Sequence, residues 1–285
     1  MFHVEQNNQP TLLAQPKDHL VSGERFDLLL DAAGEVAKTH PAPEEKNMKY
    51  YYSSKAYISH GNRKSSFFES LYALAQNQMF AQKTRWFKSI GHGKGRYLDF
   101  GCGSGGMINY LQTRGWTTAG VEPSARARAH AGLPKNIHAH LDNVSETHFD
   151  VIALWHVLEH LHTPEKTISA LREKLDHDGH LFIAVPNFKS WDAAFFHNEW
   201  AAYDVPRHLW HFSNKGLIRF IESMGFAHQK TFPLLLDAFY VSYLSLKHQQ
   251  KHFPLLRGIF YGLWSNLKAL NSGEYSSNVF VFRKD

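Results

Sequence analysis

Residues 97–106 read Tyr97-Leu98-Asp99-Phe100-Gly101-Cys102-Gly103-Ser104-Gly105-Gly106, and this stretch decides the fold. A short apolar run that contains one acid is typical of a buried strand, and residues 107–111 place apolar side chains at helical spacing. Strand, glycine turn and helix in succession are typical of a nucleotide-binding βα unit. The glycines permit a tight turn and let a ligand lie against bare backbone.

Two classes of ligand fit this turn. Gly101, Gly103 and Gly106 spell the dinucleotide pattern G-x-G-x-x-G, and Glu122 follows the next predicted strand, 117–121, where an acid binds ribose hydroxyls. Asp99 argues against a dinucleotide, because its carboxylate would face an anionic pyrophosphate. It suits S-adenosylmethionine, which offers a ribose to Glu122 and an ammonium group to Asp99.

Three motifs carry a resemblance to a known family. They are residues 98–105, residues 120–124 (Gly-Val-Glu-Pro-Ser) and residues 149–160 (Phe-Asp-Val-Ile-Ala-Leu-Trp-His-Val-Leu-Glu-His). In this order and spacing the chain resembles class I S-adenosylmethionine-dependent methyltransferases, and is similar to their ubiquinone O-methyltransferase-like branch, over residues 90–230. The resemblance implies an α/β fold with a doubly wound, seven-stranded, Rossmann-like sheet. It also implies methyl transfer from S-adenosylmethionine to a small molecule, in the first instance to an oxygen nucleophile.

The motifs also indicate which residues hold the cofactor, since ligands of such sheets bind at the carboxyl ends of the strands. We expect these residues to be Asp99, Gly101, Cys102, Gly103, Gly105, Glu122, Pro123, Asp142, Trp155, His156 and His160. For Asp142 the alternative is a solvated loop acid. Two more candidates, Tyr57 and His60, lie in an aromatic segment that folds over the cofactor in similar enzymes; packing of that lid onto the core is the alternative for Tyr57.

The sequence predicts three parts. Residues 1–48 form an N-terminal arm, and residues 49–90 form a lid segment and a long helix. Residues 91–285 form the S-adenosylmethionine-binding domain, with an aromatic insertion at 188–212 after the fifth strand. Its amphipathic segment 236–270 is a helical cover on the substrate cleft or a dimer face, which we prefer to membrane insertion.

Cysteine usage bears on both metals and compartment. In relatives of this branch a cysteine zinc ribbon precedes a Thr-x-Pro-x-Pro segment, whereas this chain has Asp31 and Gly34 where cysteines are expected. We therefore expect a hairpin without metal in the arm, and no metal site. Because Cys102 is the single cysteine, a disulfide framework within the chain is excluded, which favours a reducing cytoplasm.

The insertion at 188–212 combines aromatic rings with basic side chains, a mixture suited to a ring-bearing acceptor. Trp200, Tyr203, Arg207 and His208 are the candidate substrate residues, and the alternative for Arg207 is an ion pair with Asp204. A phenolic acceptor gains from a general base, and histidine titrates near neutral pH. The candidate bases are His156, His208 and His211, each with a hydrogen-bonding or packing role as the alternative.

Net charge and hydropathy limit the kinds of partner that the protein can bind. The formal charge of +5 is spread along the chain, which does not indicate a nucleic-acid-binding stripe, and no apolar run reaches membrane-spanning length. We expect a monomer or homodimer that acts on a small molecule. Two alternatives stay open: a nicotinamide-dependent oxidoreductase on a Rossmann fold, and a non-catalytic cofactor-binding protein.

Overall fold

In the computed structural model, the motif at 97–106 forms strand β4 (Arg96–Phe100), a glycine turn and the start of helix α4 (Gly106–Gln112). The structure describes residues 11–53, 66–130 and 136–285. Contacts between residues divide the chain into two units. The first comprises Met1–Ser54, Pro186–Arg219 and Pro233–Asn278, and the second comprises Lys55–Val185, Phe220–Phe232 and Val279–Asp285.

The seven-stranded sheet of the second unit has the order β10-β11-β8-β7-β4-β5-β6. Strands β4 to β8 pair in parallel, as expected for repeated βα units. This arrangement confirms the doubly wound fold predicted from the sequence. The strands that join β4 are β5 (Thr117–Val121), β6 (Ile137–His138), β7 (Phe149–Trp155), β8 (Leu175–Pro186), β10 (Phe226–Pro233) and β11 (Ser277–Lys284).

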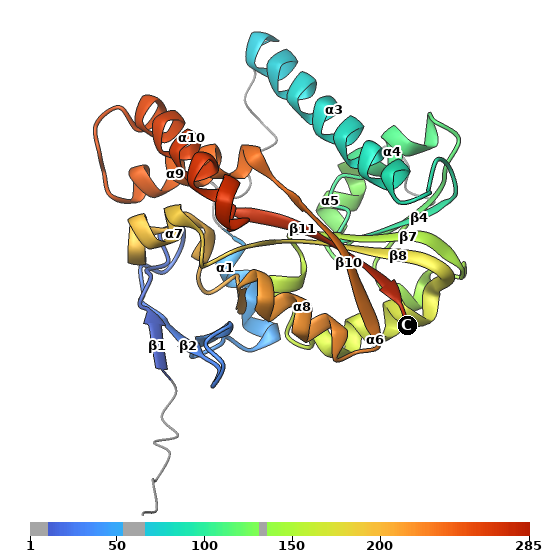
Figure 1. Ribbon diagram of the computed structural model, residues 1–285, viewed down its shortest axis with the longest axis horizontal. Helices are drawn as coiled ribbons and strands as arrows, with labels where there is room; N and C mark the ends of the chain where they lie inside the picture. Colours follow the sequence, from blue (N-terminus) through green and yellow to red (C-terminus); the bar gives the residue numbers. More distant parts are fainter. Residues whose placement is uncertain (1–10, 54–65, 131–135) are drawn as a thin grey trace, which may run out of the picture. The chain divides into compact units, whose positions relative to one another are not determined.

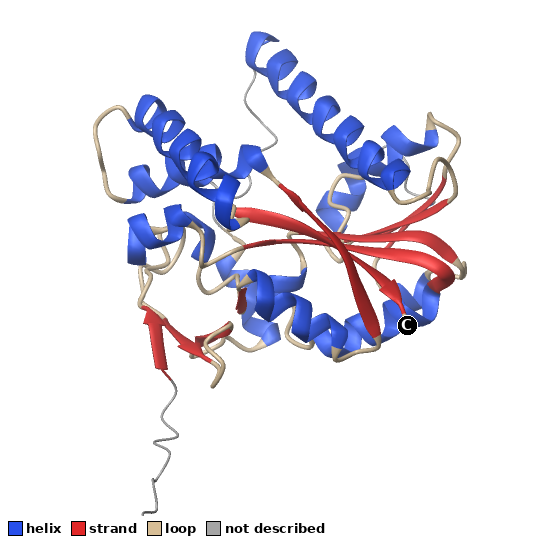
Figure 2. Cartoon of the chain, viewed as in Figure 1, coloured by secondary structure: helices blue, strands red, loops and turns tan. Residues whose placement is uncertain are grey.

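Helices cover this sheet on both sides. Figure 1 shows α3 (Ser66–Ser89) on one face and α6 (Pro164–Lys174) on the other, and Figure 2 shows the strands between them. Phe87 of α3 packs its ring 4.9 Å from Phe182 and 5.7 Å from Tyr97. Among the described residues, the remaining helical segments of this unit are α5 (Ala125–His130) and the 3₁₀ turns Leu141–Asn143 and Leu158–His160.

Helix α6 begins directly after Thr163. Pro164 stands in the first turn, where its missing N–H costs nothing. Thr163 occupies the N-cap position, but its side chain makes no capping hydrogen bond. The Thr163 carbonyl oxygen accepts hydrogen bonds from the backbone N–H and the hydroxyl of Thr167.

The first unit contains an antiparallel sheet of order β1-β2-β3-β9. Its strands are β1 (Thr11–Ala14), β2 (Asp27–Leu30), β3 (Val36–His40) and β9 (Trp210–Phe212). The hairpin predicted around Gly34 is present as β2 and β3. At its turn, Asp31 Oδ1 accepts hydrogen bonds from the backbone N–H groups of Glu35 (2.8 Å) and Val36 (3.2 Å).

The helices α1 (Met48–Tyr51), α7 (Trp191–Phe196), α9 (Leu235–His248) and α10 (Pro254–Ser272) complete this unit, and α8 (Asn214–Glu222) runs from it into the second. Its 3₁₀ turns are Glu45–Asn47, His197–Glu199 and Ala201–Tyr203. Within the described ranges, none of the helices combines the length and hydropathy needed to cross a membrane.

Candidate functional site

The motif residues converge at the carboxyl edge of the parallel strands. Asp99 pairs in register with Gly120 on β5 and with Ala153 on β7. The turns that follow β4, β5 and β7 therefore leave the sheet at the same level. This is the edge at which doubly wound sheets bind their ligands.

The glycine turn after β4 has a backbone that other residues adopt only with strain. Gly101, Gly103 and Gly105 have φ values of 82°, 54° and 73°. A Cβ atom on Gly101 would overlap the side chain of Val157, whereas one on Gly103 would meet nothing within 4 Å. Gly103 thus borders open space in which a ligand can approach the backbone.

Glu122 joins the glycine turn to the end of β5. The Gly103 N–H donates to Glu122 Oε2 at 3.0 Å, and the Ser124 N–H donates to Oε1 at 2.8 Å. Arg128 donates to the carbonyl oxygens of Glu122 (2.6 Å) and Pro123 (2.9 Å), which fixes the loop. The carboxylate is half-buried, as a group that binds hydroxyls at a site edge needs to be.

Asp99 is the most unusual group of this edge. Its side chain is 3% exposed, and its Oδ1 atom has no hydrogen-bond partner among the described residues. Burial raises the pKa of Asp99 to about 6; the Lys83 charge and the Tyr97 hydroxyl act against this shift, and Glu122 adds to it. A buried carboxylate oxygen without a partner fits a ligand that brings a cationic N–H donor. The residues present therefore fit the methionine half of S-adenosylmethionine.

Asp99 lies beside a network of polar and aromatic side chains that the sequence does not predict. Lys83 Nζ lies 3.6 Å above the ring centre of Trp155, and Trp155 Nε1 donates to the Tyr97 hydroxyl at 3.0 Å. Burial and the nearby Asp99 charge raise the pKa of Tyr97, which keeps its proton. Trp155 was among the predicted cofactor residues. Lys83 and Tyr97 were not, since one lies on a distant helix and the other reads as an ordinary strand residue.

The turn after β7 holds His156 in a strained backbone conformation, with φ at 54°. Its Nδ1 atom lies 3.3 Å from Oε1 of Glu159, whose side chain is 1% exposed. A buried carboxylate beside one ring nitrogen can fix the orientation of an imidazole whose other nitrogen takes up a proton. His160 is half-buried in the same turn.

The other predicted cofactor residues differ in their surroundings. Burial raises the pKa of Cys102, with further contributions from Asp99 and Glu122, so its thiol stays protonated. Asp142 is exposed in a 3₁₀ turn, and Pro123 is exposed after Glu122. Tyr57 and His60 lie outside the described residues.

The predicted acceptor residues belong to the first unit, where most of their polar groups have partners. Trp200 Nε1 donates to Asp192 Oδ2 at 2.7 Å. His208 Nδ1 lies 2.9 Å from the Ala202 carbonyl oxygen, and His211 Nε2 lies 3.0 Å from the Thr39 hydroxyl. Tyr203 is buried, and this burial raises its pKa. All four rings are thus part of the interior of this unit.

Arg207 is 1% exposed and lies between two carboxylates. Its Nη2 atom is 3.0 Å from Asp18 Oδ1 and 2.7 Å from Asp204 Oδ1, and its Nη1 donates to the Tyr51 carbonyl. The ion pair between Arg207 and Asp204, which was the alternative expectation, is present. Arg207 is buried, and its guanidinium also pairs with Asp18. This interior position favours a structural role for Arg207 over direct contact with an acceptor.

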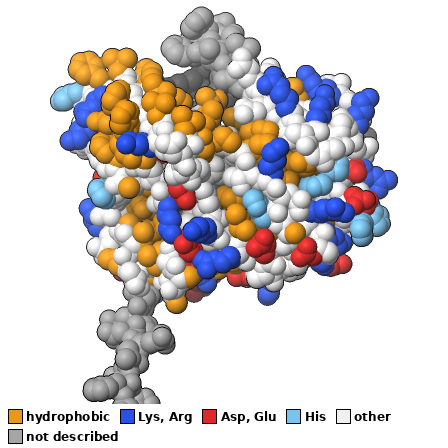
Figure 3. Space-filling view, in the orientation of Figure 1, with side chains coloured by type: hydrophobic (Ala, Val, Ile, Leu, Met, Phe, Trp, Pro, Cys, Tyr) orange, Lys and Arg blue, Asp and Glu red, His pale blue; other side chains and the backbone are white. Residues whose placement is uncertain are grey.

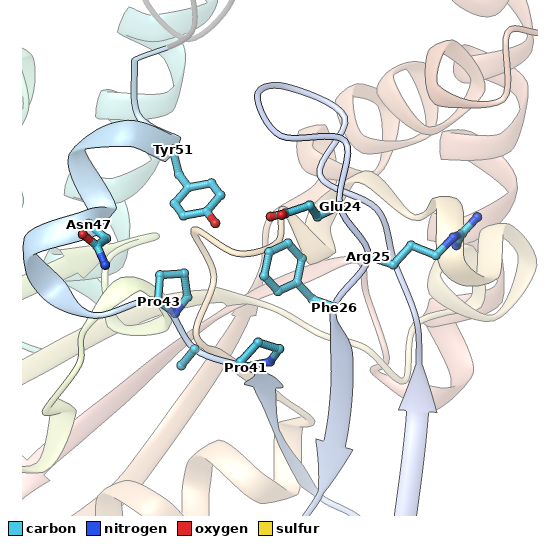
Figure 4. Close-up of a pocket in the computed structure, with 8 residues that line it drawn as sticks. Glu24, Arg25, Phe26, Pro41, Pro43, Asn47 and Tyr51 are labelled. Carbon is cyan, nitrogen blue, oxygen red and sulfur yellow. The ribbon is translucent and has the colours of Figure 1, made fainter.

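A surface hollow of about 530 Å³ also lies in the first unit. Figure 4 shows the Tyr51 hydroxyl and the Glu24 carboxylate pointing toward each other across it. The other lining residues are Arg25, Phe26, Pro41, Ala42, Pro43 and Asn47. None of the predicted site residues lines this hollow.

Solved structures resemble the fold. A magnesium protoporphyrin IX methyltransferase from Synechocystis, crystallised with S-adenosylhomocysteine, has a TM-score of 0.54 at 13% identity and covers 85% of this chain and all of that one. A geranyl diphosphate C-methyltransferase from Streptomyces coelicolor has a TM-score of 0.52 at 12% identity, over 79% of this chain and 88% of that one. At such identities the likeness concerns the fold alone.

Curated relatives match part of the chain. A ubiquinone biosynthesis O-methyltransferase from Yersinia enterocolitica is 31% identical over 128 residues, 39% of this chain and 52% of the relative. One from Yersinia pestis is 30% identical over 156 residues, 49% of this chain and 62% of the relative. The chain therefore spans between half and two thirds of the length of these relatives.

The model of a family described as a methyltransferase domain matches residues 72–230, more than half of the chain. The matched range contains the glycine turn, Glu122 and the turn after β7. The match confirms the resemblance drawn from the three motifs: the chain belongs to the methyltransferase-domain family.

Proposed function

We propose that this protein transfers a methyl group from S-adenosylmethionine to an oxygen atom of a small-molecule acceptor, in the cytoplasm. The observation that carries the proposal is the buried Asp99 carboxylate at the strand edge beside the glycine turn, whose Oδ1 has no hydrogen-bond partner in the part of the chain that the structure describes. Membership of the methyltransferase-domain family supports the reaction class. The names of the curated relatives support oxygen as the acceptor atom.

Different residues of the chain bind different parts of the methyl donor, S-adenosylmethionine. Asp99 accepts a hydrogen bond from the ammonium group of the methionine part, and Glu122 accepts hydrogen bonds from the ribose hydroxyls. The backbone N–H groups of Gly103 and Ser124 donate to the Glu122 carboxylate and hold it in place. Gly103 lets the ligand approach the backbone. Bound S-adenosylmethionine supplies a methyl group on a positively charged sulfur.

His156 is our candidate for the base that takes the acceptor proton. A phenolic hydroxyl has a pKa of about 10, so a nearby imidazole assists its ionisation near neutral pH. Glu159 stands beside Nδ1 of His156, in the role of orienting group. His208 and His211 already bond within the interior of the first unit, which makes them weaker candidates.

The insertion at 188–212 remains our candidate for the acceptor side. Its composition supports this assignment, and the interior bonds of Trp200 and Arg207 indicate that they shape the segment rather than grip the acceptor. Alanine at His208 is expected to lower methyl transfer and to leave donor affinity within a few-fold of the original. A large loss of affinity for S-adenosylmethionine in this variant would indicate that the insertion binds the donor rather than the acceptor.

Calorimetry of the purified protein with S-adenosylmethionine and with NADH tests the proposal. We expect binding of the first ligand only, because Asp99 disfavours a pyrophosphate. Glu122→Ala is expected to weaken donor binding ten- to hundredfold, since charge-assisted hydrogen bonds contribute about 1.5–3 kcal/mol. The exposed Glu146 provides a matched control, and Glu146→Ala is expected to leave donor affinity unchanged.

Binding of NADH alone would favour the oxidoreductase alternative. A screen of phenolic, carboxylate and lipid-precursor acceptors with labelled donor then separates an enzyme from a non-catalytic binding protein. Donor binding without transfer to any acceptor class would contradict the catalytic part of the proposal.

A further inference from the structure

Large apolar side chains are exposed along the helical hairpin formed by α9 and α10. Fifteen large hydrophobic side chains are exposed among the described residues, and twelve of them lie between Leu235 and Leu270. The exposed fraction ranges from 42% at Trp264 to 74% at Phe253. Figure 3 shows hydrophobic side chains gathered over these helices. We call the exposed large apolar side chains of residues 253–270 the α10 face.

The α10 face points outward because the opposite side of the helix is built from small residues. Gly258, Gly262, Ser265 and Ala269 are the buried positions of α10. A Cβ atom on Gly262 would lie 2.6 Å from the Phe239 Cα atom of α9, so the two backbones approach closely. This side has no room for large side chains, which is the reverse of an ordinary surface helix.

A buried carboxylate fixes the rotation of α10. Asp192 accepts hydrogen bonds from the hydroxyls of Ser265 (2.7 Å) and Ser276 (2.6 Å), and from the indole of Trp200. Ser265 lies in the middle of α10, so this bond holds the small side of the helix inward. The exposure of the α10 face is therefore a consequence of packing within the first unit.

Charge indicates what covers the α10 face. Residues 238–273 contain no Asp or Glu, whereas they contain Lys247, Lys251, Arg257 and Lys268. Lys268 Nζ lies 5.2 Å from the ring centre of Trp264, which places a cation at the edge of the apolar surface. Two copies of this segment would bring like charges together, while an anionic lipid headgroup complements them.

We propose that the α9–α10 hairpin docks this protein on the surface of an anionic lipid bilayer, which departs from the cleft cover or dimer face expected for this segment from the sequence. The α10 face enters the boundary between headgroups and acyl chains, and the lysines and Arg257 lie among the phosphates. Apolar side chains with Trp and Phe on one side of a helix, and basic residues beside them, are typical of helices that lie in the plane of a bilayer. This proposal does not depend on the methyl acceptor.

Co-sedimentation with vesicles tests the proposal, using phosphatidylcholine alone and mixed with phosphatidylglycerol. We expect binding to the mixed vesicles that weakens as salt is raised. Leu256→Gln with Phe260→Gln is expected to reduce this binding more than tenfold, because each side chain loses its transfer into an apolar phase. Lys251→Gln is expected to reduce it about fivefold on mixed vesicles.

The matched control is Leu12→Gln with Tyr50→Gln, which alters two exposed apolar side chains outside the hairpin. It is expected to bind vesicles as the original does. Because Leu256 is 68% and Phe260 is 61% exposed, their replacement leaves the interior intact, which circular dichroism checks. A second pair, Leu255→Gln with Leu263→Gln, is expected to behave as the first.

Two kinds of result would overturn the proposal. One is equal binding to mixed vesicles by the original protein and both hairpin variants, or no binding by any of them. The other is a dimer in sedimentation velocity that the hairpin variants dissociate, without vesicle binding, which would assign the α10 face to a second copy. Quenching of Trp264 by brominated lipids, lost in Trp264→Phe, would support the proposed depth.

Discussion

At the scale of single residues, the protonation of Asp99 makes donor binding depend on pH. Its pKa of about 6 means that the carboxyl group becomes protonated in mildly acidic solution. Since the ammonium group of the donor binds the ionised form, we expect the affinity for S-adenosylmethionine to fall about tenfold per pH unit below that value. Calorimetry in two buffers of different ionisation enthalpy measures the proton released on binding. Asp99→Asn is expected to bind weakly and without this pH dependence.

The same group predicts a change in stability without the donor. A raised pKa in the folded state means that the folded protein binds the proton more tightly than the unfolded chain does. The free energy of unfolding is therefore expected to fall by about 3 kcal/mol as pH rises from about 4 through 6. In Asp99→Asn this pH-dependent fall in the free energy of unfolding is expected to be absent, because asparagine does not titrate. Thermal unfolding across this range checks both proteins, and identical pH profiles would contradict the assignment.

Gly103 offers a direct test of where the donor lies. Gly103→Ala is expected to cost about 1–2 kcal/mol of stability through its left-handed backbone, and to abolish donor binding by occupying the open space. Gly34→Ala is the matched control, because Gly34 also has a positive φ and open space around it. We expect a similar loss of melting temperature in both variants, and loss of binding in Gly103→Ala alone. Retained binding in Gly103→Ala would remove the turn from the site.

These residues also show what sequence can and cannot indicate. Asp99 and Glu122 could be proposed from the sequence because Asp99 lies near the end of β4, just before the glycine turn, and Glu122 directly follows β5. Lys83 was not predicted because its contact with Trp155 depends on the packing of α3 against the sheet, and Tyr97 was not predicted because its bond to Trp155 depends on the pairing of β4 with β7. No local pattern marks such a contact between residues far apart in the chain.

At the scale of elements, the insertion at 188–212 depends on the N-terminal segment through Arg207. Replacing Arg207 by Met is expected to cost about 3–5 kcal/mol, because Asp18 is left as a buried charge without its cation. The exposed Arg25 is the control, and Arg25→Met is expected to cost less than about 1 kcal/mol. Chemical denaturation measures both. Equal stability of the two variants would show that the buried pair contributes little.

Helix α10 illustrates a second limit of sequence reasoning. The sequence predicts an amphipathic helical segment at 236–270, and α9 and α10 occupy most of this range. The pattern alone did not reveal which side is buried, because large apolar residues normally face a core. The glycines that allow close helix packing, Gly258 and Gly262, were the available signal.

At the scale of the whole molecule, the parallel sheet was predictable while the division into units was not. Strands β4 and β5 have local signatures and were placed within a residue or two. The first unit is assembled from three separate stretches of chain, and its sheet joins β3 to β9 across more than 160 residues. Such pairings depend on tertiary contacts that leave no periodic trace in the sequence.

The position of β11 has a consequence for synthesis on the ribosome. This strand lies between β10 and β8, yet it follows every other strand of the sheet in the sequence. While residues 277–284 are still inside the exit tunnel, β8 and β10 each present an unpaired backbone edge. At that stage the nascent chain already contains the glycine motif and Glu122, but its sheet cannot yet close. Emergence of residues 277–284 from the tunnel, rather than synthesis of the glycine motif, is therefore the moment at which the sheet can become complete.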